Sequence, residues 1–190
     1  AVPGYVTLFK KVFGESGVTA ENIGKAIATF ERSIVSKNSP YDKYMQGNKK
    51  AMSKAAVAGM NLFFGKAKCS ICHNGPAFTD SKFHNIGVRQ QGPLKEDSGR
   101  FNVTKDESDK GAFKTPGLRH VGRHAPYMHD GSKATLKDVV EFYDRGGDVE
   151  QNRSPFITPL GLTVKEKKEL LEFLLALEGS PIIVSLPELP

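Results

Sequence analysis

The sequence predicts an all-α domain with long irregular loops, and three observations support that prediction. Five segments have apolar residues spaced as on one face of a helix. A polar, glycine-rich stretch at 74–111 lacks this period and predicts loops, with a short strand at 83–88. A Cys-x-x-Cys-His motif at 69–73 comes directly before that stretch, and its two cysteines are the only ones in the chain.

The first fifty residues predict two helices. Apolar residues at 4–14 indicate a short helix, and Thr19 precedes a longer one. The apolar residues of the longer helix recur at three- and four-residue steps and therefore form one stripe, which consists of Ile23, Ala26, Ile27, Phe30 and Ile34. Asn38 and Pro40 then interrupt the helical pattern.

Three more helices are predicted around and after the motif. Ser53 is the expected N-cap of a helix that runs to Gly65 and leads into the motif. Thr135 is the expected N-cap of the next helix. Thr163 begins a capping-box sequence for the last helix, and Gly179 is its expected C′ residue.

The Cys69-x-x-Cys72-His73 motif is the attachment sequence of a c-type haem. Two thiols at this spacing can add across the two vinyl groups of a haem edge, and His73 then lies under the iron as proximal ligand. A redox dithiol normally begins a helix in a βαβ unit, and no such pattern is seen in the sequence. A zinc site needs further ligands, for which His84 is the only close candidate. The sequence therefore predicts one covalent haem c in a cytochrome c-like haem domain.

The second axial ligand of the iron decides what such a haem does, and four residues are candidates. Met128 would raise the reduction potential, as in electron-carrying cytochromes. A phenolate from Tyr143 would stabilise ferric iron and lower the potential. His129 or His84 would give a bis-histidine haem. Spacing alone does not choose among them, and an open position would instead let peroxide bind.

Charge and hydropathy exclude two classes of partner. The net charge is +6, but the lysines are scattered and no basic run is interleaved with aromatic residues. We therefore expect a basic surface that attracts an acidic partner, and no nucleic acid. No apolar run approaches the roughly 20 residues of a membrane span. Covalent haem c is assembled outside the bacterial cytoplasmic membrane, so we expect a removed leader and a periplasmic location.

Further motifs resemble a known family. They are Asn-Gly-Pro-Ala-Phe-Thr-Asp after the haem motif, Phe-His-Asn-Ile-Gly at 83–87, Phe-Lys-Thr-Pro-x-Leu-Arg at 113–119, Ala-Pro-Tyr-Met-His-Asp-Gly at 125–131 and the helix sequence at 135–147. Together they resemble the second, C-terminal haem domain of the bacterial di-haem cytochrome c peroxidase and MauG family. The resemblance implies an inter-domain helical segment at 1–50, the haem domain at 51–180 and an extended tail at 181–190.

The resemblance also implies roles for individual residues. Cys69 and Cys72 would hold the haem, and His73 would be its proximal ligand. The family's distal ligand lies seventeen residues past the proline of the Ala-Pro-Tyr turn, here Pro126, and that position is Tyr143. Classical peroxidases of the family have Met at this position, whereas MauG-like members have Tyr.

The resemblance thus favours Tyr143 over Met128, which is the alternative distal ligand. It further implies a calcium ion between the two haem domains of the family. The backbone carbonyls of His124 and Pro126 would be among the calcium ligands, and a carbonyl ligand does not depend on the side chain.

Three features depart from the family pattern. There is one haem motif where the family has two, Trp is absent, and Ala67 stands where MauG has a Trp. The resemblance therefore implies the electron-transfer domain of a periplasmic peroxidase that takes electrons from a small donor protein. Hydrogen peroxide would be reduced at a second haem, on another domain or chain. The alternative is a stand-alone mono-haem cytochrome c that only carries electrons.

Overall fold

The computed structural model describes residues 2–91, 97–181, 183–185 and 187–190. The chain divides into two compact units, an N-terminal unit of Ala1–Lys37 with Ser180–Pro190 and a motif unit of Asn38–Gly179. The boundary expected from the family resemblance lies at residues 50 and 51. The contacts divide the chain at residues 37 and 38, because the segment 38–50 packs within the motif unit, and the expected domain bounds stay a prediction.

The N-terminal unit contains the two predicted helices, α1 at Pro3–Phe13 and α2 at Ala20–Ser33. Between them lies a single 3-10 turn, η1, at Gly14–Ser16. The buried amide of Asn22 ties the start of α2 to this turn, since its Nδ2 donates to Ser16 Oγ at 3.0 Å and to the Gly17 carbonyl at 2.8 Å. The apolar stripe on α2 is largely exposed, and its exposed residues are Ile23, Ile27 and Phe30.

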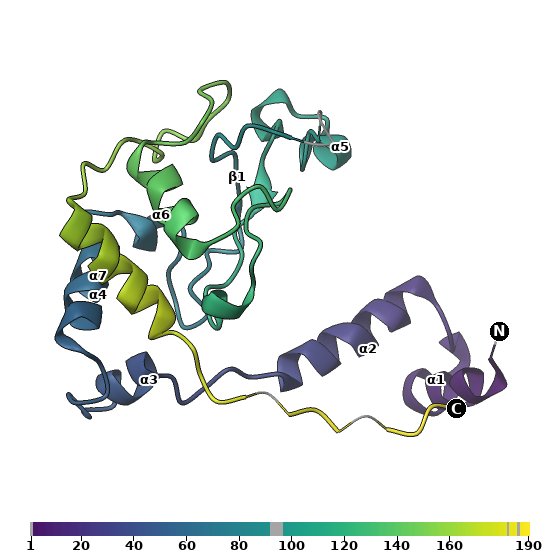
Figure 1. The fold of residues 1–190 in the computed structure, drawn as a ribbon. Coiled ribbons are helices and arrows are strands. Elements are labelled where there is room, and N and C mark those ends of the chain that lie inside the picture. Colours follow the sequence, from purple (N-terminus) through teal and green to yellow (C-terminus); the bar gives the residue numbers. More distant parts are fainter. Residues whose placement is uncertain (1, 92–96, 182, 186) are drawn as a thin grey trace. The chain divides into compact units, whose positions relative to one another are not determined.

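The regular structure of the motif unit is nearly all helical, with a two-stranded ladder as the one sheet among its described residues, and long irregular loops join the elements (Figure 1). Its helices are α3 at Pro40–Met45, α4 at Lys54–Phe64, η2 at Cys69–Ile71, α5 at Phe101–Thr104, η3 at Glu107–Asp109, η4 at Val121–Arg123, α6 at Leu136–Asp144 and α7 at Val164–Leu175. Its strands are β1 at Phe83–His84 and β2 at Phe113–Lys114, which pair antiparallel. The strand expected at 83–88 is thus only two residues long.

The three predicted N-caps of this unit are confirmed, but one predicted helix end is wrong. The side-chain oxygens of Ser53, Thr135 and Thr163 each accept a hydrogen bond from the backbone N–H three residues on. Helix α7 ends at Leu175 rather than near Gly179. Its C-cap and the following Leu177 are buried, so the chain leaves the helix by turning into the core.

Helix α3 lies where the sequence predicted an interruption. Ser39 and Asp42 form a capping box, in which the backbone N–H of Asp42 donates to Ser39 Oγ at 3.1 Å and the N–H of Ser39 donates to the Asp42 carboxylate at 3.0 Å. Pro40 is the first helical residue, where a missing N–H and a fixed φ favour the helix. The proline therefore begins a helix here.

The core of the motif unit lies where α4 crosses α7. Gly59 faces α7 so closely that a Cβ atom at this position would overlap the carbonyl oxygen of Glu169. Beside this crossing the Phe63 ring lies 5.1 Å from the Phe173 ring and 5.9 Å from the Phe78 ring, between centroids. All three phenylalanines are buried, and each contributes about 1.5–3 kcal/mol of hydrophobic stabilisation.

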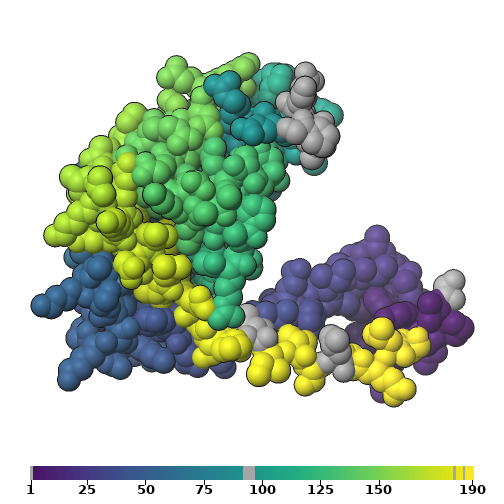
Figure 2. Space-filling model, in the orientation of Figure 1, coloured from purple at the N-terminus to yellow at the C-terminus, as the bar shows by residue number. Residues whose placement is uncertain are grey.

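The long loops pack onto these helices. In the space-filling view the teal and green loop segments form a continuous mass with α6 and α7 (Figure 2). Side chains link loops that are distant in sequence: Asn85 Nδ2 donates to the carbonyls of Lys110 at 3.0 Å and Gln151 at 3.3 Å. None of the helices in the described part of the chain is long and apolar enough to cross a membrane.

Candidate haem site

A cavity of about 940 Å³ lies between the haem motif, α6 and the loops. Seven residues that the sequence analysis named as haem attachment residues or candidate ligands line it: Cys69, Cys72, His73, His84, Met128, His129 and Tyr143. His124 and Pro126 do not belong to its lining and are both exposed. The volume is at the upper end of the range typical of ligand and cofactor sites.

The two cysteines are presented by a tight turn at the end of the α4 segment. Lys68 has a left-handed backbone with φ of 56°, and η2 follows directly, so both thiols face one cavity. Neither forms a disulfide. Burial raises the pKa of the Cys69 thiol to about 12. A thiol held neutral in this way is a poor nucleophile for disulfide exchange, which disfavours use of the motif as a redox dithiol.

The imidazole of His73 is held in one tautomer. Its Nδ1 lies 2.9 Å from the carbonyl oxygen of Phe78, which can only accept a hydrogen bond, so Nδ1 carries the proton. Burial lowers the pKa of His73, which keeps the ring neutral. With the proton on Nδ1, Nε2 carries the lone pair that an iron ligand requires. Phe78 has a φ of 55° and a buried ring, so the aromatic core fixes the carbonyl that orients His73.

Helix α6 presents Tyr143 to the cavity while both neighbours anchor the helix. Phe142 is fully buried, and the Asp144 carboxylate lies 2.7 Å from Lys167 Nζ on α7. Burial raises the pKa of Tyr143, and the nearby sulfurs of Cys69 and Cys72 raise it further. The phenol lines the same cavity as the two thiols, and it ionises only if a cation compensates the charge. Ferric iron would be such a cation.

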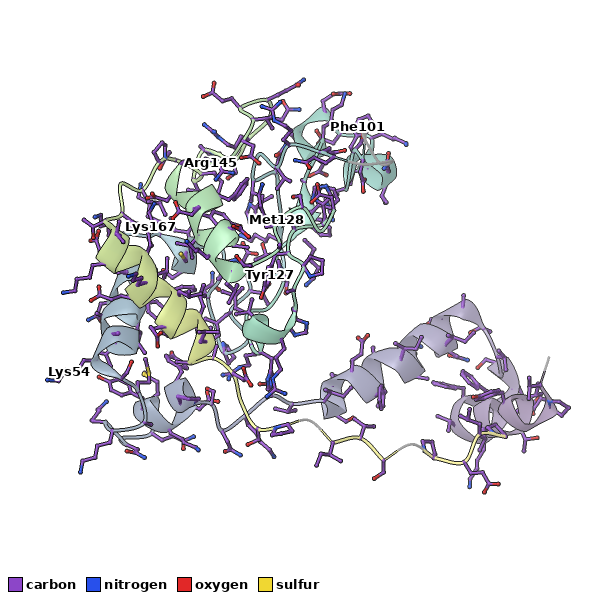
Figure 3. All side chains as sticks on the ribbon, viewed as in Figure 1. Lys54, Phe101, Tyr127, Met128, Arg145 and Lys167 are labelled. Atoms are coloured by element: carbon purple, nitrogen blue, oxygen red, sulfur yellow. The ribbon has the colours of Figure 1, made fainter. Side chains whose placement is uncertain are left out.

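Met128 and His129 reach the same cavity from the loop between η4 and α6, on which Figure 3 labels Tyr127 and Met128. Met128 has a left-handed backbone with φ of 71°, and the ring of His129 stacks on Phe113 with centroids 3.7 Å apart. The Tyr127 hydroxyl holds the loop by donating to the Val121 carbonyl at 2.9 Å. The cavity therefore brings the sequence candidates for the distal position together, and its lining does not choose among them.

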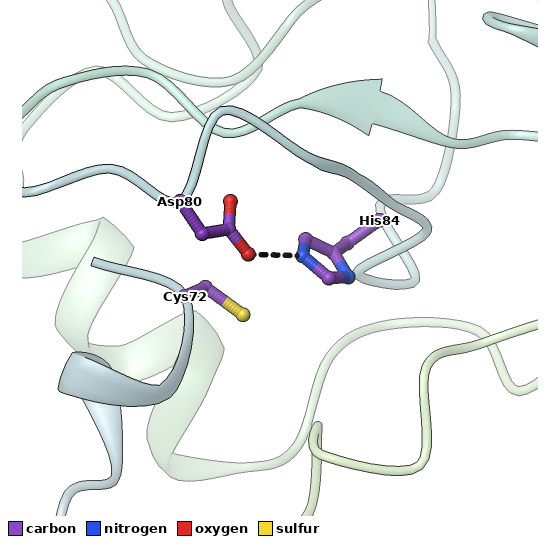
Figure 4. Close-up of side chains that lie close together, drawn as sticks. All are labelled: Cys72, Asp80 and His84. Carbon is purple, nitrogen blue, oxygen red and sulfur yellow. Dashed lines mark hydrogen bonds and ion pairs between the residues drawn. The ribbon is translucent and has the colours of Figure 1, made fainter. Parts of the chain in front are cut away.

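The imidazole of His84 interacts with the carboxylate of Asp80. Its Nε2 lies 2.8 Å from Asp80 Oδ2, and both lie near the sulfur of Cys72 (Figure 4). Burial opposes ionisation of Asp80, but hydrogen bonds from His84 and from the Lys82 backbone outweigh it and lower its pKa to about 2. These three residues form the one cluster of potential metal ligands among the described residues. Because Cys69 is not part of the cluster, a zinc site here would leave the other half of the motif unused.

The comparisons with known proteins agree with these motifs. Residues 1–50 match the family model of the di-haem cytochrome c peroxidases. Over its whole length the chain is 38% identical to the methylamine utilization protein MauG of Methylorubrum extorquens, 38% identical to the cytochrome c551 peroxidase of Nitrosomonas europaea and 37% identical to a cytochrome-c peroxidase of Denitromonas iodatirespirans. The chain belongs to the di-haem cytochrome c peroxidase and MauG family. Membership implies a c-type haem cofactor.

The chain covers only part of its relatives in this peroxidase and MauG family. It spans 54% of the length of the Methylorubrum MauG and of the Nitrosomonas peroxidase, and 58% of the Denitromonas peroxidase. A MauG-like protein associated with microbial copper homeostasis has a similar structure, with a TM-score of 0.76 and 32% identity over 93% of this chain and 62% of that one. The fold also matches the di-haem peroxidase BthA of Burkholderia thailandensis, with a TM-score of 0.58, 23% identity and coverage of 75% and 46%.

The residues and the cavity fit the haem c of this family. Two neutral thiols, an imidazole with its lone pair on Nε2 and a phenol line one cavity that is apolar beside the motif. The sequence analysis missed two residues that prepare this arrangement, Phe78 and Asp80. The left-handed backbone of Phe78, which directs its carbonyl, has no signal in the sequence. Asp80 and His84 are four residues apart in the sequence, but only the folded loop brings their side chains into contact.

Proposed function

We propose that this chain is the electron-transfer domain of a periplasmic di-haem peroxidase, with a cytochrome c-like fold around one covalent haem c. The observation that carries the proposal is the convergence of Cys69, Cys72, His73 and Tyr143 on one cavity, with His73 held by the Phe78 carbonyl. When bound, the haem supplies reversible one-electron transfer. The whole polypeptide would reduce hydrogen peroxide.

Each residue has a defined part in this proposal. Cys69 and Cys72 tether the porphyrin edge, and His73 offers Nε2 as the proximal ligand. Tyr143 offers its phenol oxygen as the distal ligand, with Met128 as the alternative. Occupation of both axial positions would exclude peroxide from this site, so the domain relays electrons and the peroxide reacts at a second haem. That haem would lie on another domain or a partner chain.

The net charge of the chain and the exposed residues His124 and Pro126 suggest two further partners, a donor protein and a calcium ion. A small donor protein with an acidic surface would be attracted by the net charge of +6, and its association would slow as salt rises. The carbonyls of His124 and Pro126, on exposed residues, are available for a calcium ion at a contact with the second haem domain.

Replacement of the candidate distal ligands tests the proposal. In the holoprotein, Tyr143→Phe should change the ferric absorbance spectrum and raise the reduction potential, because a phenolate stabilises ferric iron. Met128→Leu, the matched variant from the same cavity, should leave both nearly unchanged. The opposite pattern would show that Met128 is the ligand. If neither variant changed the spectrum or the potential, neither residue would be an iron ligand.

The alternative function is that of a mono-haem carrier, and one observation favours it. The chain has two cysteines, both in one motif, and can therefore hold only one haem of this kind. Mass spectrometry of the protein isolated from its source separates the two functions. A mass near 20.8 kDa plus one haem supports the carrier, whereas a longer chain with two haems, oxidising a donor cytochrome when peroxide is added, supports the peroxidase.

A further inference from the structure

The cavity has two chemically different ends. Beside the motif its lining includes Ala67, Ile71 and Leu160 as well as the two thiols. At the other end the lining includes a group of polar and charged residues: Arg89, Gln90, Asp97, Ser98, Lys110 and Asn152. A haem held by thioethers has the same asymmetry, because its vinyl groups and its two propionates lie on opposite edges of the porphyrin.

Backbone and side-chain hydrogen bonds show which end of the cavity lies beside the cysteines and which lies away from them. Next to the motif, the N–H of Asp80 donates to the Cys72 carbonyl at 2.7 Å and the N–H of Thr115 donates to the Lys82 carbonyl at 2.8 Å. From there two chain segments run away from the cysteines together, through the β1–β2 ladder (Figure 1). The bond from Asn85 to the Lys110 carbonyl is the next link along them.

Two more links complete the far end of these segments. The N–H of Gly111 donates to the Ser98 carbonyl at 3.0 Å, and the Gln90 side chain bonds the backbone of Asp97 through both its donor and its acceptor. Arg89 adjoins this last link and lines the cavity. It therefore belongs to the end opposite the thiols.

The cations at this end differ in their partners. Lys110 Nζ lies 3.8 Å from a Glu107 carboxylate oxygen, and it also lies over the Phe101 ring. Arg89 forms no ion pair with any acidic side chain among the described residues, although it lines a cavity. Its guanidinium is a planar fork that matches a carboxylate with two parallel hydrogen bonds. Asp97 also lines this end, and its negative charge would repel a carboxylate bound there. A carboxylate at this end therefore needs a cation beside it.

We propose that Arg89 binds a propionate of the haem and thereby positions the porphyrin in the cavity. This inference rests on the proposed function, since it assumes the haem c held by Cys69 and Cys72. Arg89 acts as a positioning residue, and Ser98 adds an uncharged donor at the same end. Lys68 lines the same cavity but precedes Cys69 directly, so it lies at the thioether edge and cannot serve the propionates.

Resonance Raman spectroscopy of the holoprotein tests this assignment through the propionate bending band, with the reduction potential as a second readout. Arg89→Gln should shift the band and lower the potential, because removal of a positive charge favours ferric iron. Lys68→Gln removes the same charge from the other edge and should leave the band in place. Arg89→Lys, which keeps the charge and loses the fork, should give a smaller shift in the band than Arg89→Gln.

An unchanged propionate band in Arg89→Gln, or an equal shift in Lys68→Gln, would overturn the assignment while leaving the haem domain intact. A wild-type protein without a Soret band would instead remove the proposed function itself. Arg89 is exposed and outside the helical core, and comparison of far-UV circular dichroism among the variants shows directly that the fold is retained.

Discussion

The crossing of α4 and α7 gives a sharp test of the packing that supports the haem motif. Gly59→Ala adds a Cβ that would overlap the Glu169 carbonyl and lie 2.9 Å from the Phe173 Cβ. The change gains about 1 kcal/mol of helix propensity. Overpacking costs about 1–3 kcal/mol, and the upper part of that range applies because the opposing atoms are backbone, which moves only if α7 moves. We expect a net loss of about 1–2 kcal/mol.

Urea unfolding of the holoprotein, followed by the Soret band, measures this loss in the motif unit. Gly24→Ala is the control, because Gly24 is helical and its added Cβ would have no neighbour within 4 Å. It should stabilise α2 by up to about 1 kcal/mol, measured by far-UV circular dichroism. If Gly59→Ala left the unfolding midpoint unchanged or raised it, the close approach of α4 and α7 would be wrong.

Two further predictions concern ion pairs of the motif unit. Arg119→Lys should lower the free energy of unfolding by about 1–3 kcal/mol, because two guanidinium nitrogens bond the Asp42 carboxylate at 3.0 and 2.9 Å in a half-buried pair. Arg123→Lys at an exposed pair should change it by less than about 1 kcal/mol, and equal losses would count against the half-buried pair. The Lys66 ammonium lowers the pKa of Glu166 from 4.5 to about 2, so its contribution is full above pH 4.5 and is lost as the pH falls towards 2. Lys66→Gln should therefore reduce the loss of stability over that range, and an unchanged acid titration of unfolding would refute the pairing.

Helix starts could be predicted from the sequence because their signals are local. Ser53, Thr135 and Thr163 each cap a helix through a backbone N–H only three residues away, so no distant contact is needed. The start of α3 follows the same rule, but Pro40 was interpreted as an interruption instead of a first helical residue. The end of α7 depends on burial of Leu177, which is a tertiary effect and has no local signal.

The candidate site was predictable in its residues and not in its shape. The spacing of Cys69, Cys72 and His73 is determined by the chemistry of haem attachment, so it can be seen without a structure. The Phe78 carbonyl is different, because its direction depends on a left-handed backbone and a ring buried against Phe63. Similarly, Arg89 is one of many exposed cations in the sequence, and only the folded loops show that it lines the cavity.

The two candidate distal ligands differ in how rigidly the fold holds them. Spacing could not choose between Met128 and Tyr143, and the family resemblance favoured Tyr143. The cavity contains both residues, with Tyr143 on a helix anchored by Phe142 and Asp144 and Met128 on a loop. A ligand on an anchored helix is held more rigidly, which supports Tyr143.

Intact-protein mass spectrometry tests the central claim most directly, namely that this chain carries a porphyrin bound through both of its cysteines. The account predicts that residues 1–190, produced alone in a host that attaches haem c, have the mass of this polypeptide plus one haem, and that the adduct survives denaturation in acid. Replacement of both Cys69 and Cys72 by Ala should remove it. A denatured wild-type protein with the mass of the polypeptide alone would contradict the account.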